Sequence, residues 1–170
     1  MDEARLAQFI ESEIEPNVAQ WERDRHVPME IFRKAGQAGL CGLMLPIEDG
    51  GYNLSLQELV SVFEKLAYSD MGFAFALVPH NNLANAIARQ ATPAVKSRYL
   101  PQLLSGDVIG AFLLTEPEVG SDASRITTTA ELNGDRWFLN GEKSWVTNSN
   151  RADLLRVYAQ TEPGSGAKGI

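Results

Sequence analysis

The chain has 170 residues, of which 44% are hydrophobic and 22% charged, and this composition is typical of a globular protein. Its net charge of −7 argues against a nucleic-acid partner, because neutralising phosphates requires a basic surface. Cys41 is the one cysteine, so neither an intrachain disulfide nor a cysteine-cluster metal site can form, and we expect a core residue in a reducing, cytoplasmic protein. No apolar run is long enough for a signal peptide or a membrane span.

Residues 1–107 are predicted to be helical. Apolar side chains recur at helical spacing between Leu6 and Ile14, and a proline then breaks that run. Ser55 and Glu58 have the spacing of a capping box, with apolar residues following at helical intervals. The other expected helices begin near Pro28, Asp70 and Thr92, and the last of them ends near Gly106.

After residue 107 the sequence becomes typical of strands and turns. Asn133-Gly134 is a typical hairpin turn between two alternating segments. The strands that we predict cover residues 108–115, 127–132, 137–139, 143–147 and 154–159. These patterns predict an α+β fold, with an N-terminal helical domain over residues 1–107 and an antiparallel β-domain over residues 108–170.

The segment from Phe112 to Asp122 is the most informative part of the sequence. Its apolar run ends in Thr115 and leads through a proline turn to Gly120 and Ser121. A strand that ends in this way brings a hydroxyl and main-chain groups to a heteroaromatic ring, and the glycine lets the backbone approach a diphosphate closely. Taken alone, the segment is explained equally well as a strand leading into an ordinary turn, with Ser121 or Asp122 as a helix cap.

A second segment, from Asn140 to Asn148, places Trp145 and Thr147 on a further predicted strand. An indole offers a large contact surface to a planar ring, and a threonine hydroxyl can hydrogen-bond a ring nitrogen. Considered alone, this segment is better explained by a tryptophan packed in the core of a sheet. The functional interpretation therefore depends on both segments together.

Several other polar residues are not expected to do chemistry. Glu116 lies next to a proline and is interpreted as a solvated or hydrogen-bonded support, not as an acid or base. Ser121 lacks the Gly-x-Ser-x-Gly elbow of a nucleophilic serine. His26 and His80 have no partners at metal-ligand spacing, so we expect no metal site and treat His80 as a packed helix residue.

The two segments together resemble the flavin-binding motifs of the acyl-CoA dehydrogenases. The family pattern Thr-Glu-Pro-x-x-Gly-Ser-Asp is matched by residues 115–122, and Asn-Gly-x-Lys-x-Trp-Ile/Val-Thr-Asn is matched by residues 140–148. Residues 46–52 are similar to the family's Pro-x-x-x-Gly-Gly loop, and residues 99–103 to the segment before the flavin strand. The resemblance covers essentially the whole chain and implies an FAD cofactor that is held mostly by the β-domain.

The resemblance also implies which residues meet the cofactor. The residues expected to border the isoalloxazine ring are Phe112, Leu114, Thr115, Trp145 and Thr147. Gly120 and Ser121 would meet the FAD diphosphate, with Ser121 also near the CoA arm of a substrate.

The same resemblance implies an acyl-CoA substrate. The floor of the acyl pocket would come from Phe75, Val78 and Asn82 on the long helix after Asp70. A phenyl ring at this place suggests a short or compact acyl group. An electron-transfer flavoprotein is the implied electron acceptor, and a homo-oligomer is the implied assembly of the full-length form.

Family members continue into further strands and a C-terminal four-helix domain, which in most of them supplies the glutamate base. No carboxylate in these 170 residues matches that base. We therefore expect an N-terminal portion of an FAD-dependent acyl-CoA dehydrogenase, with a β-domain truncated at its C-terminal side. By itself it should be catalytically inactive, bind FAD weakly or not at all, and expose apolar surface. A flavin oxidase or monooxygenase of the same superfamily and a non-catalytic homologue are the alternatives.

Overall fold

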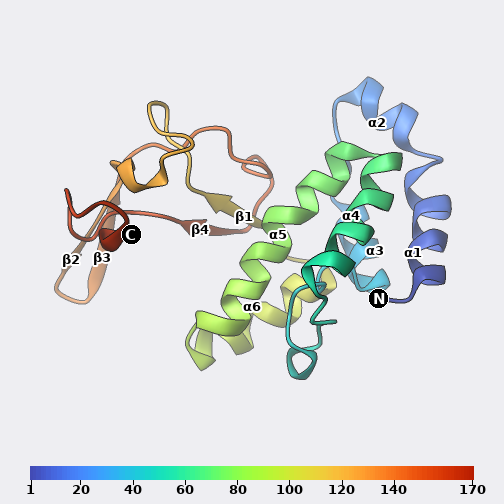
Figure 1. The fold of residues 1–170 in the computed structure, drawn as a ribbon, viewed down its shortest axis with the longest axis horizontal. Coiled ribbons are helices and arrows are strands. Elements are labelled where there is room, and N and C mark those ends of the chain that lie inside the picture. Colours follow the sequence, from blue (N-terminus) through green and yellow to red (C-terminus); the bar gives the residue numbers. More distant parts are fainter.

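The structure, a computed structural model, describes residues 1–170 and joins a bundle of helices to a smaller part built of strands and loops (Figure 1). The α-helices are α1 (Glu3–Phe9), α2 (Val18–Asp24), α3 (Glu30–Ala38), α4 (Leu56–Ser69), α5 (Met71–Gln90) and α6 (Pro93–Ser105). A π-helical segment covers Ile10–Ile14, and 3-10 helices cover Ile47–Asp49, Ala123–Arg125 and Gly166–Gly169. The strands are β1 (Gly110–Leu113), β2 (Thr129–Asn133), β3 (Arg136–Asn140) and β4 (Leu154–Val157). The predicted α+β class is confirmed. None of the helices has both the length and the apolar character needed to cross a membrane.

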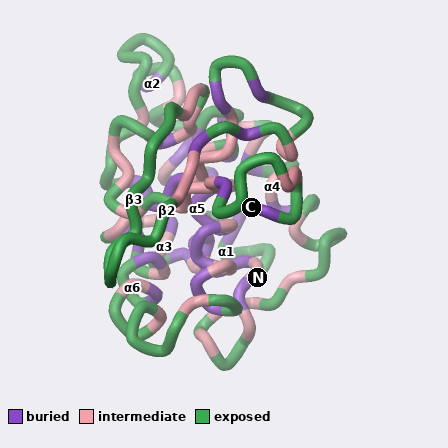
Figure 2. Tube along the Cα trace, turned by 90° about the vertical axis from the view of Figure 1, so that its left-hand side faces the viewer, coloured by how far each residue is buried: buried purple, intermediate pink, exposed green.

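Helix α5 is the longest element and contacts α4, α6 and strand β1 (Figure 1). Its first turn is capped as predicted, because the Asp70 carboxylate accepts a hydrogen bond from the backbone N–H of Phe73. The Phe73 ring lies at the centre of the helical core, 6.0 Å from the ring of Phe9 and 5.8 Å from that of Phe32. Buried residues gather around these helices, whereas the hairpin of β2 and β3 is exposed (Figure 2).

The other helix signals are also found in the structure. Ser55 and Glu58 form the predicted capping box at the start of α4. Thr92 caps α6, and that helix ends at Gly106 in the left-handed conformation. Cys41 is fully buried, as expected for a core residue, and burial raises the pKa of its thiol to about 12.

His80 ties α5 to two neighbouring elements and is fully buried. Its Nδ1 accepts a hydrogen bond from the backbone N–H of Gly110 at 3.2 Å, so the proton lies on Nε2, which donates to the carbonyl of Leu103 at 3.0 Å. Burial lowers the pKa of this imidazole to about 4, although the bond to the Leu103 carbonyl acts in the opposite direction. His80 is therefore a neutral structural residue that fixes α6 and β1 against α5.

The strands form two separate two-stranded sheets. Strands β2 and β3 pair antiparallel around the predicted Asn133-Gly134 turn. Strands β1 and β4, however, pair in parallel, with Gly110 opposite Leu154, and this differs from the expected antiparallel sheet. Parallel pairing needs a long connection, and the chain between β1 and β4, which includes the hairpin, provides it.

The strand predicted over residues 143–147 is wrong. This segment has no strand pairing, and Trp145 adopts a left-handed backbone with φ 57°. Asn148 follows with φ 68°, so the chain turns twice where a strand would run straight. The apolar and β-branched residue types favoured a strand, but hydrogen bonds to distant segments hold this loop in place.

Gly106 has a conformation and surroundings that only glycine fits. Its φ is +72°, and a Cβ atom there would overlap the carbonyl oxygen of Phe32. Gly134 has a similar φ of +66° but open space around it, so it is a matched control. We expect Gly106→Ala to lower the free energy of unfolding by about 2 kcal/mol more than Gly134→Ala, because only the first adds overlap to backbone strain. Urea denaturation of both variants tests this, and equal losses would contradict it.

Candidate functional site

A cavity of about 210 Å³, which we call the ring cavity, lies where the middle of α5, the end of β1 and the loop before Asn148 meet. The residues that line it are Phe75, Val78, Pro79, Asn82, Phe112, Leu114, Thr115, Ser144, Trp145 and Thr147. The structure thus brings together the predicted ring-binding and acyl-pocket residues, which lie far apart in the sequence. Gly120 and Ser121 are the predicted site residues that do not line this cavity.

Close packing of β1 on α5 positions the Phe112 side of the cavity. A Cβ atom at Gly110 would lie 2.6 Å from a terminal methyl carbon of Leu83, so glycine lets the strand approach the helix without displacing that side chain. Two residues later, the ring of Phe112 packs against that of Tyr158 with centroids 4.9 Å apart. The strand end is therefore held from both sides before it reaches Leu114 and Thr115.

The loop that carries Trp145 is anchored at both of its ends. Before Trp145, the backbone N–H of Ser144 donates to the carbonyl of Thr115 at 2.8 Å. After it, the Asn148 amide donates to the carbonyls of Ala76 at 2.9 Å and Gly110 at 3.2 Å. Between these anchors Trp145 is 92% exposed and has a left-handed backbone conformation. A bulky residue in this conformation is strained, and such strain is typical of functional positions.

Several polar groups around the cavity have no partner in the protein. The hydroxyls of Thr115 and Thr147 and the side-chain amide of Asn82 make no hydrogen bond within the chain, and none of them is fully buried. These groups can hydrogen-bond the edge of a heterocycle, while the Trp145 indole can cover its face. The cavity is smaller than a typical ligand pocket of about 300–1,000 Å³, so it suits one ring system of a larger ligand. The residues present therefore fit the ring of the expected flavin.

Gly120 and Ser121 lie on an exposed turn beyond the end of β1. A Cβ atom at Gly120 would have no neighbour within 4 Å, so the backbone there is open to a ligand. Asp122 follows, and its carboxylate accepts a hydrogen bond from the Ser124 hydroxyl instead of capping a helix. This turn can be reached only by a part of the ligand that extends outside the ring cavity.

Glu116 is the site residue whose importance the sequence did not reveal. It is buried, and its two carboxylate oxygens accept hydrogen bonds from the backbone N–H and the hydroxyl of both Thr127 and Thr128, at 2.6–2.9 Å. Lys143 Nζ adds an ion pair at 2.9 Å. Burial by itself would raise the pKa of Glu116, but the bonds from Thr128, Lys143 and Thr127 outweigh it and hold that pKa far below its ordinary value. Glu116 is thus a support that stays ionised at neutral pH, as the sequence suggested in part, and is not an acid or base.

An apolar groove lies along α4 and α5 and shares two lining residues with the ring cavity. Its volume is about 490 Å³, and one of its lining residues, Glu64, is charged. The lining residues are Leu59, Val60, Phe63, Glu64, Ala67, Met71, Ala74, Phe75 and Val78. Because Phe75 and Val78 border both the groove and the ring cavity, a ligand with a ring at one end and an apolar chain beside it would fit the two together.

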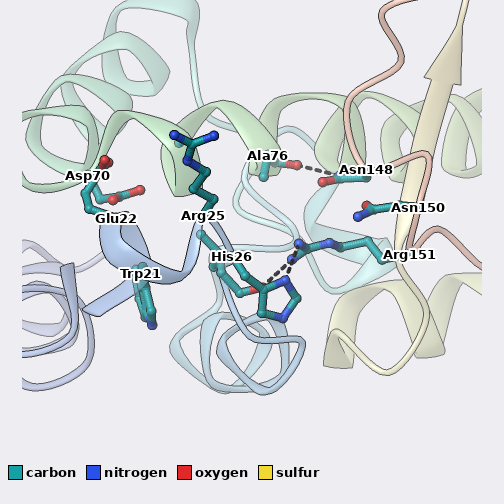
Figure 3. A pocket seen from close by; sticks show the side chains of 11 residues that line it. Trp21, Glu22, Arg25, His26, Asp70, Ala76, Asn148, Asn150 and Arg151 are labelled. Atoms are coloured by element: carbon teal, nitrogen blue, oxygen red, sulfur yellow. Dashed lines mark hydrogen bonds between the residues drawn. The ribbon is translucent and has the colours of Figure 1, made fainter. Parts of the chain in front are cut away.

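A separate polar cavity of about 370 Å³ lies between the end of α2, the start of α5 and residues 148–151 (Figure 3). The Arg151 guanidinium there donates to the carbonyl of Val27 and contacts Nδ1 of His26 at 3.3 Å (Figure 3). Glu22 and Asp70 place negative charges beside the positive charges of the cavity. Arg151 already has partners in the protein, and charges of both signs lie side by side, so this cavity is a poorer ligand site than the ring cavity.

Comparison with known proteins identifies matching families for both parts of the chain. The family described as acyl-CoA dehydrogenase, N-terminal domain, matches residues 2–107. The family described as acyl-CoA dehydrogenase, middle domain, matches residues 111–170. Together these matches include all of the residues that line the ring cavity.

Individual relatives agree with the family matches. A glutaryl-CoA dehydrogenase from Desulfococcus multivorans is 33% identical over 100% of this chain and 45% of its own length. Among solved structures, a glutaryl-CoA dehydrogenase from Mycobacterium smegmatis in complex with FADH2 is 32% identical, with a TM-score of 0.86 over 95% of this chain and 44% of that one. A chain in a structure of the electron transferring flavoprotein of Acidaminococcus fermentans is 36% identical, with a TM-score of 0.88 over 98% of this chain and 44% of that one. The chain therefore spans less than half the length of these relatives.

Proposed function

Because the chain belongs to the acyl-CoA dehydrogenase family, we propose that it supplies the N-terminal helical part and a portion of the middle β-domain of an FAD-dependent enzyme that desaturates an acyl-CoA thioester between Cα and Cβ. We place the division between the two parts at residues 107 and 108. The observation that carries this proposal is the ring cavity, which joins an exposed indole to unpartnered hydroxyls. The FADH2 complex of the related glutaryl-CoA dehydrogenase supports FAD as the cofactor.

Five side chains of the ring cavity have a proposed task toward the flavin ring. Phe112 and Leu114 supply apolar contacts to the ring, and Trp145 covers the ring and excludes water. The hydroxyls of Thr115 and Thr147 hydrogen-bond its polar edge, with Thr147 close to the nitrogen that reacts. FAD, when bound, would accept the hydride that leaves Cβ of the acyl group.

The exposed turn after β1 is proposed to hold the more polar parts of the ligands. The open space at Gly120 lets backbone N–H groups approach the FAD diphosphate. The Ser121 hydroxyl, which is exposed, is proposed to contact both this diphosphate and the CoA arm of the substrate. Backbone N–H groups and a hydroxyl can bind a diphosphate without a cationic side chain, which is consistent with the net charge of −7.

The acyl group is proposed to lie against Phe75, Val78 and Asn82. The first two of these residues connect the ring cavity to the apolar groove, so an acyl chain can enter the groove while its Cα and Cβ stay beside the ring. The Phe75 ring occupies the junction and shortens the available path. We therefore propose a short or compact acyl group.

Shortening Phe75 is expected to change the preferred acyl length. We expect Phe75→Ala to raise the affinity for octanoyl-CoA relative to butanoyl-CoA about tenfold, because a longer chain can then pass into the groove. Phe138→Ala is the matched control, since Phe138 is an equally exposed phenylalanine that lines neither the groove nor the ring cavity. Calorimetric titration of the FAD-supplemented protein with both thioesters measures the ratio. An unchanged ratio, or strong octanoyl-CoA binding before the substitution, would contradict the role of Phe75.

The remaining parts of the reaction are proposed to come from outside these residues. The lining of the ring cavity contains no carboxylate, so the base that removes the Cα proton must be supplied by another part of the protein. The chain by itself is therefore expected to be inactive. An electron-transfer flavoprotein is proposed as the electron acceptor, supported by the similar chain in the Acidaminococcus fermentans structure, and the whole protein is proposed to be a homo-oligomer.

The reaction is tested by adding acyl-CoA without oxygen to the FAD-loaded protein that contains this chain. We expect the flavin absorbance to bleach and to return quickly with an electron-transfer flavoprotein but slowly with oxygen. Rapid return with oxygen would instead indicate an oxidase or monooxygenase. A flavin that binds and never bleaches would indicate a non-catalytic homologue.

A further inference from the structure

Three segments of the β part converge on the buried pair of Glu116 and Lys143. The side chains are only 3% and 7% exposed, respectively, and their charged atoms lie 2.9 Å apart. Glu116 belongs to the strand end that supplies Leu114 and Thr115 to the ring cavity. Lys143 belongs to the loop that presents Trp145, and the hydrogen bonds from Thr127 and Thr128 add the segment that leads into β2.

Lys143 also joins the two walls of the ring cavity directly. Its ammonium donates a second hydrogen bond to the carbonyl of Leu114 at 3.0 Å. The next residue, Ser144, donates its backbone N–H to the carbonyl of Thr115 at 2.8 Å. Three bonds therefore connect residues 143 and 144 to residues 114–116, immediately before Trp145 enters its left-handed conformation.

The cost of burying this pair suggests that it has a task beyond stability. Replacing a buried ion pair by apolar groups of similar volume is often neutral or stabilising, so burial of the charges is not required for folding. An apolar side chain in place of Lys143 could not form directional hydrogen bonds that fix the Leu114 carbonyl and the residue 116 side chain. The positions of these two groups determine where the strained Trp145 backbone lies relative to the Thr115 hydroxyl.

We propose that Glu116 and Lys143 are positioning residues that hold the Trp145 loop against the end of β1 and so fix the two walls between which the planar ring binds. Asn148 acts at the other end of the same loop through its bonds to Ala76 and Gly110. This inference rests on the proposed function for the identity of the ring, but the order of the loop can be measured without any ligand. Neither residue touches the ring itself, since neither lines the cavity.

The test uses the double variant Glu116→Gln/Lys143→Met, which removes both charges and so leaves no unpaired buried ion. Its matched control is Asp49→Asn/Lys96→Met, which removes a partly buried ion pair of the helical part that does not line the ring cavity. The first readout is the indole N–H resonance of Trp145, with the 15N relaxation of residues 143–147, in the free protein. The second is the dissociation constant for FAD.

We expect the double variant to stay folded while its Trp145 resonance moves and residues 143–147 lose order on the nanosecond timescale. FAD affinity should fall about tenfold, the equivalent of about 1.4 kcal/mol, while the control changes neither readout. If the double variant does not fold, Thr127→Val, which removes one donor to Glu116, should move the Trp145 resonance in part. Trp145 signals that match the parent protein in the folded variants would overturn the inference. Failure of the whole protein that contains this chain to bind FAD would count against the proposed function only.

Discussion

Replacing Lys143 alone with methionine is expected to lower the free energy of unfolding by about 3–5 kcal/mol, because it leaves the Glu116 carboxylate buried without its counter-ion. The remaining donors from Thr127 and Thr128 satisfy hydrogen bonds but do not neutralise the charge. Urea denaturation at pH 7 measures the loss. At this size of effect, the unfolded fraction of a marginally stable domain rises by more than a hundredfold.

The double variant Glu116→Gln/Lys143→Met is the control for this prediction. Removal of both charges should restore most of the lost stability, which gives a large favourable coupling between the two positions. Comparing the two variants separates stability from positioning, since the bonds from Lys143 to Leu114 and Glu116 are missing in both. Equal destabilisation of the single and double variants would contradict the assignment of a buried ion pair.

Acidification from pH 7 to pH 4 is expected to cost about 3 kcal/mol of stability through His80 alone. In the unfolded chain this imidazole takes up a proton near its ordinary pKa of 6.5, whereas in the folded protein burial lowers its pKa to about 4. Between these values the unfolded state binds more protons, so stability falls as the pH falls. The folded protein therefore keeps His80 neutral, and the neutral ring makes the hydrogen bonds to Leu103 and Gly110.

Protonation of Glu116 causes a second loss of folding stability at lower pH. Its folded pKa lies below the ordinary value of 4.5, so its contribution is fully present above that value and is lost as the pH falls toward the folded pKa. Urea denaturation at several pH values resolves the two windows. His80→Gln should remove the loss between pH 6.5 and 4 and leave the loss below it. A His80→Gln variant with an unchanged slope in the upper window would contradict the assignment to His80.

The helical part of the fold could be predicted well because its signals are local. The Ser55–Glu58 capping box, the Asp70 cap of α5 and Gly106 at the end of α6 are each recognised from a few neighbouring residues. The hairpin of β2 and β3 was equally clear, because Asn133-Gly134 specifies its turn. In these cases the residues that form the cap or turn are close together in sequence, so the local pattern is enough to predict it.

The β part and the candidate site depend on partners that are distant in sequence, and here sequence reasoning was incomplete. The parallel pairing of β1 with β4 is set by a connection of some forty residues, which no local pattern reports. The loop at residues 143–147 contains strand-forming residue types, but its bonds to Thr115 and Gly110 impose a different path. Glu116 was interpreted as a support, yet its burial becomes apparent only once Thr127, Thr128 and Lys143 surround it. The ring-binding residues were named through the family motifs and not through their spacing.

The most direct test of the ring site is a titration of the 15N-labelled 170-residue chain with FAD, followed through its indole N–H resonances. The three tryptophans report on different places: Trp21 lies in the helical core, Trp137 on the exposed hairpin, and Trp145 at the ring cavity. Because the cavity holds only one ring system, we expect weak binding that moves the Trp145 indole resonance and the amides of Thr115 and Thr147. The indole resonances of Trp21 and Trp137 should not move. Shifts at the exposed Trp137 as large as those at Trp145, or FAD binding that leaves the residues around the cavity unshifted, would contradict a flavin-ring site at this position.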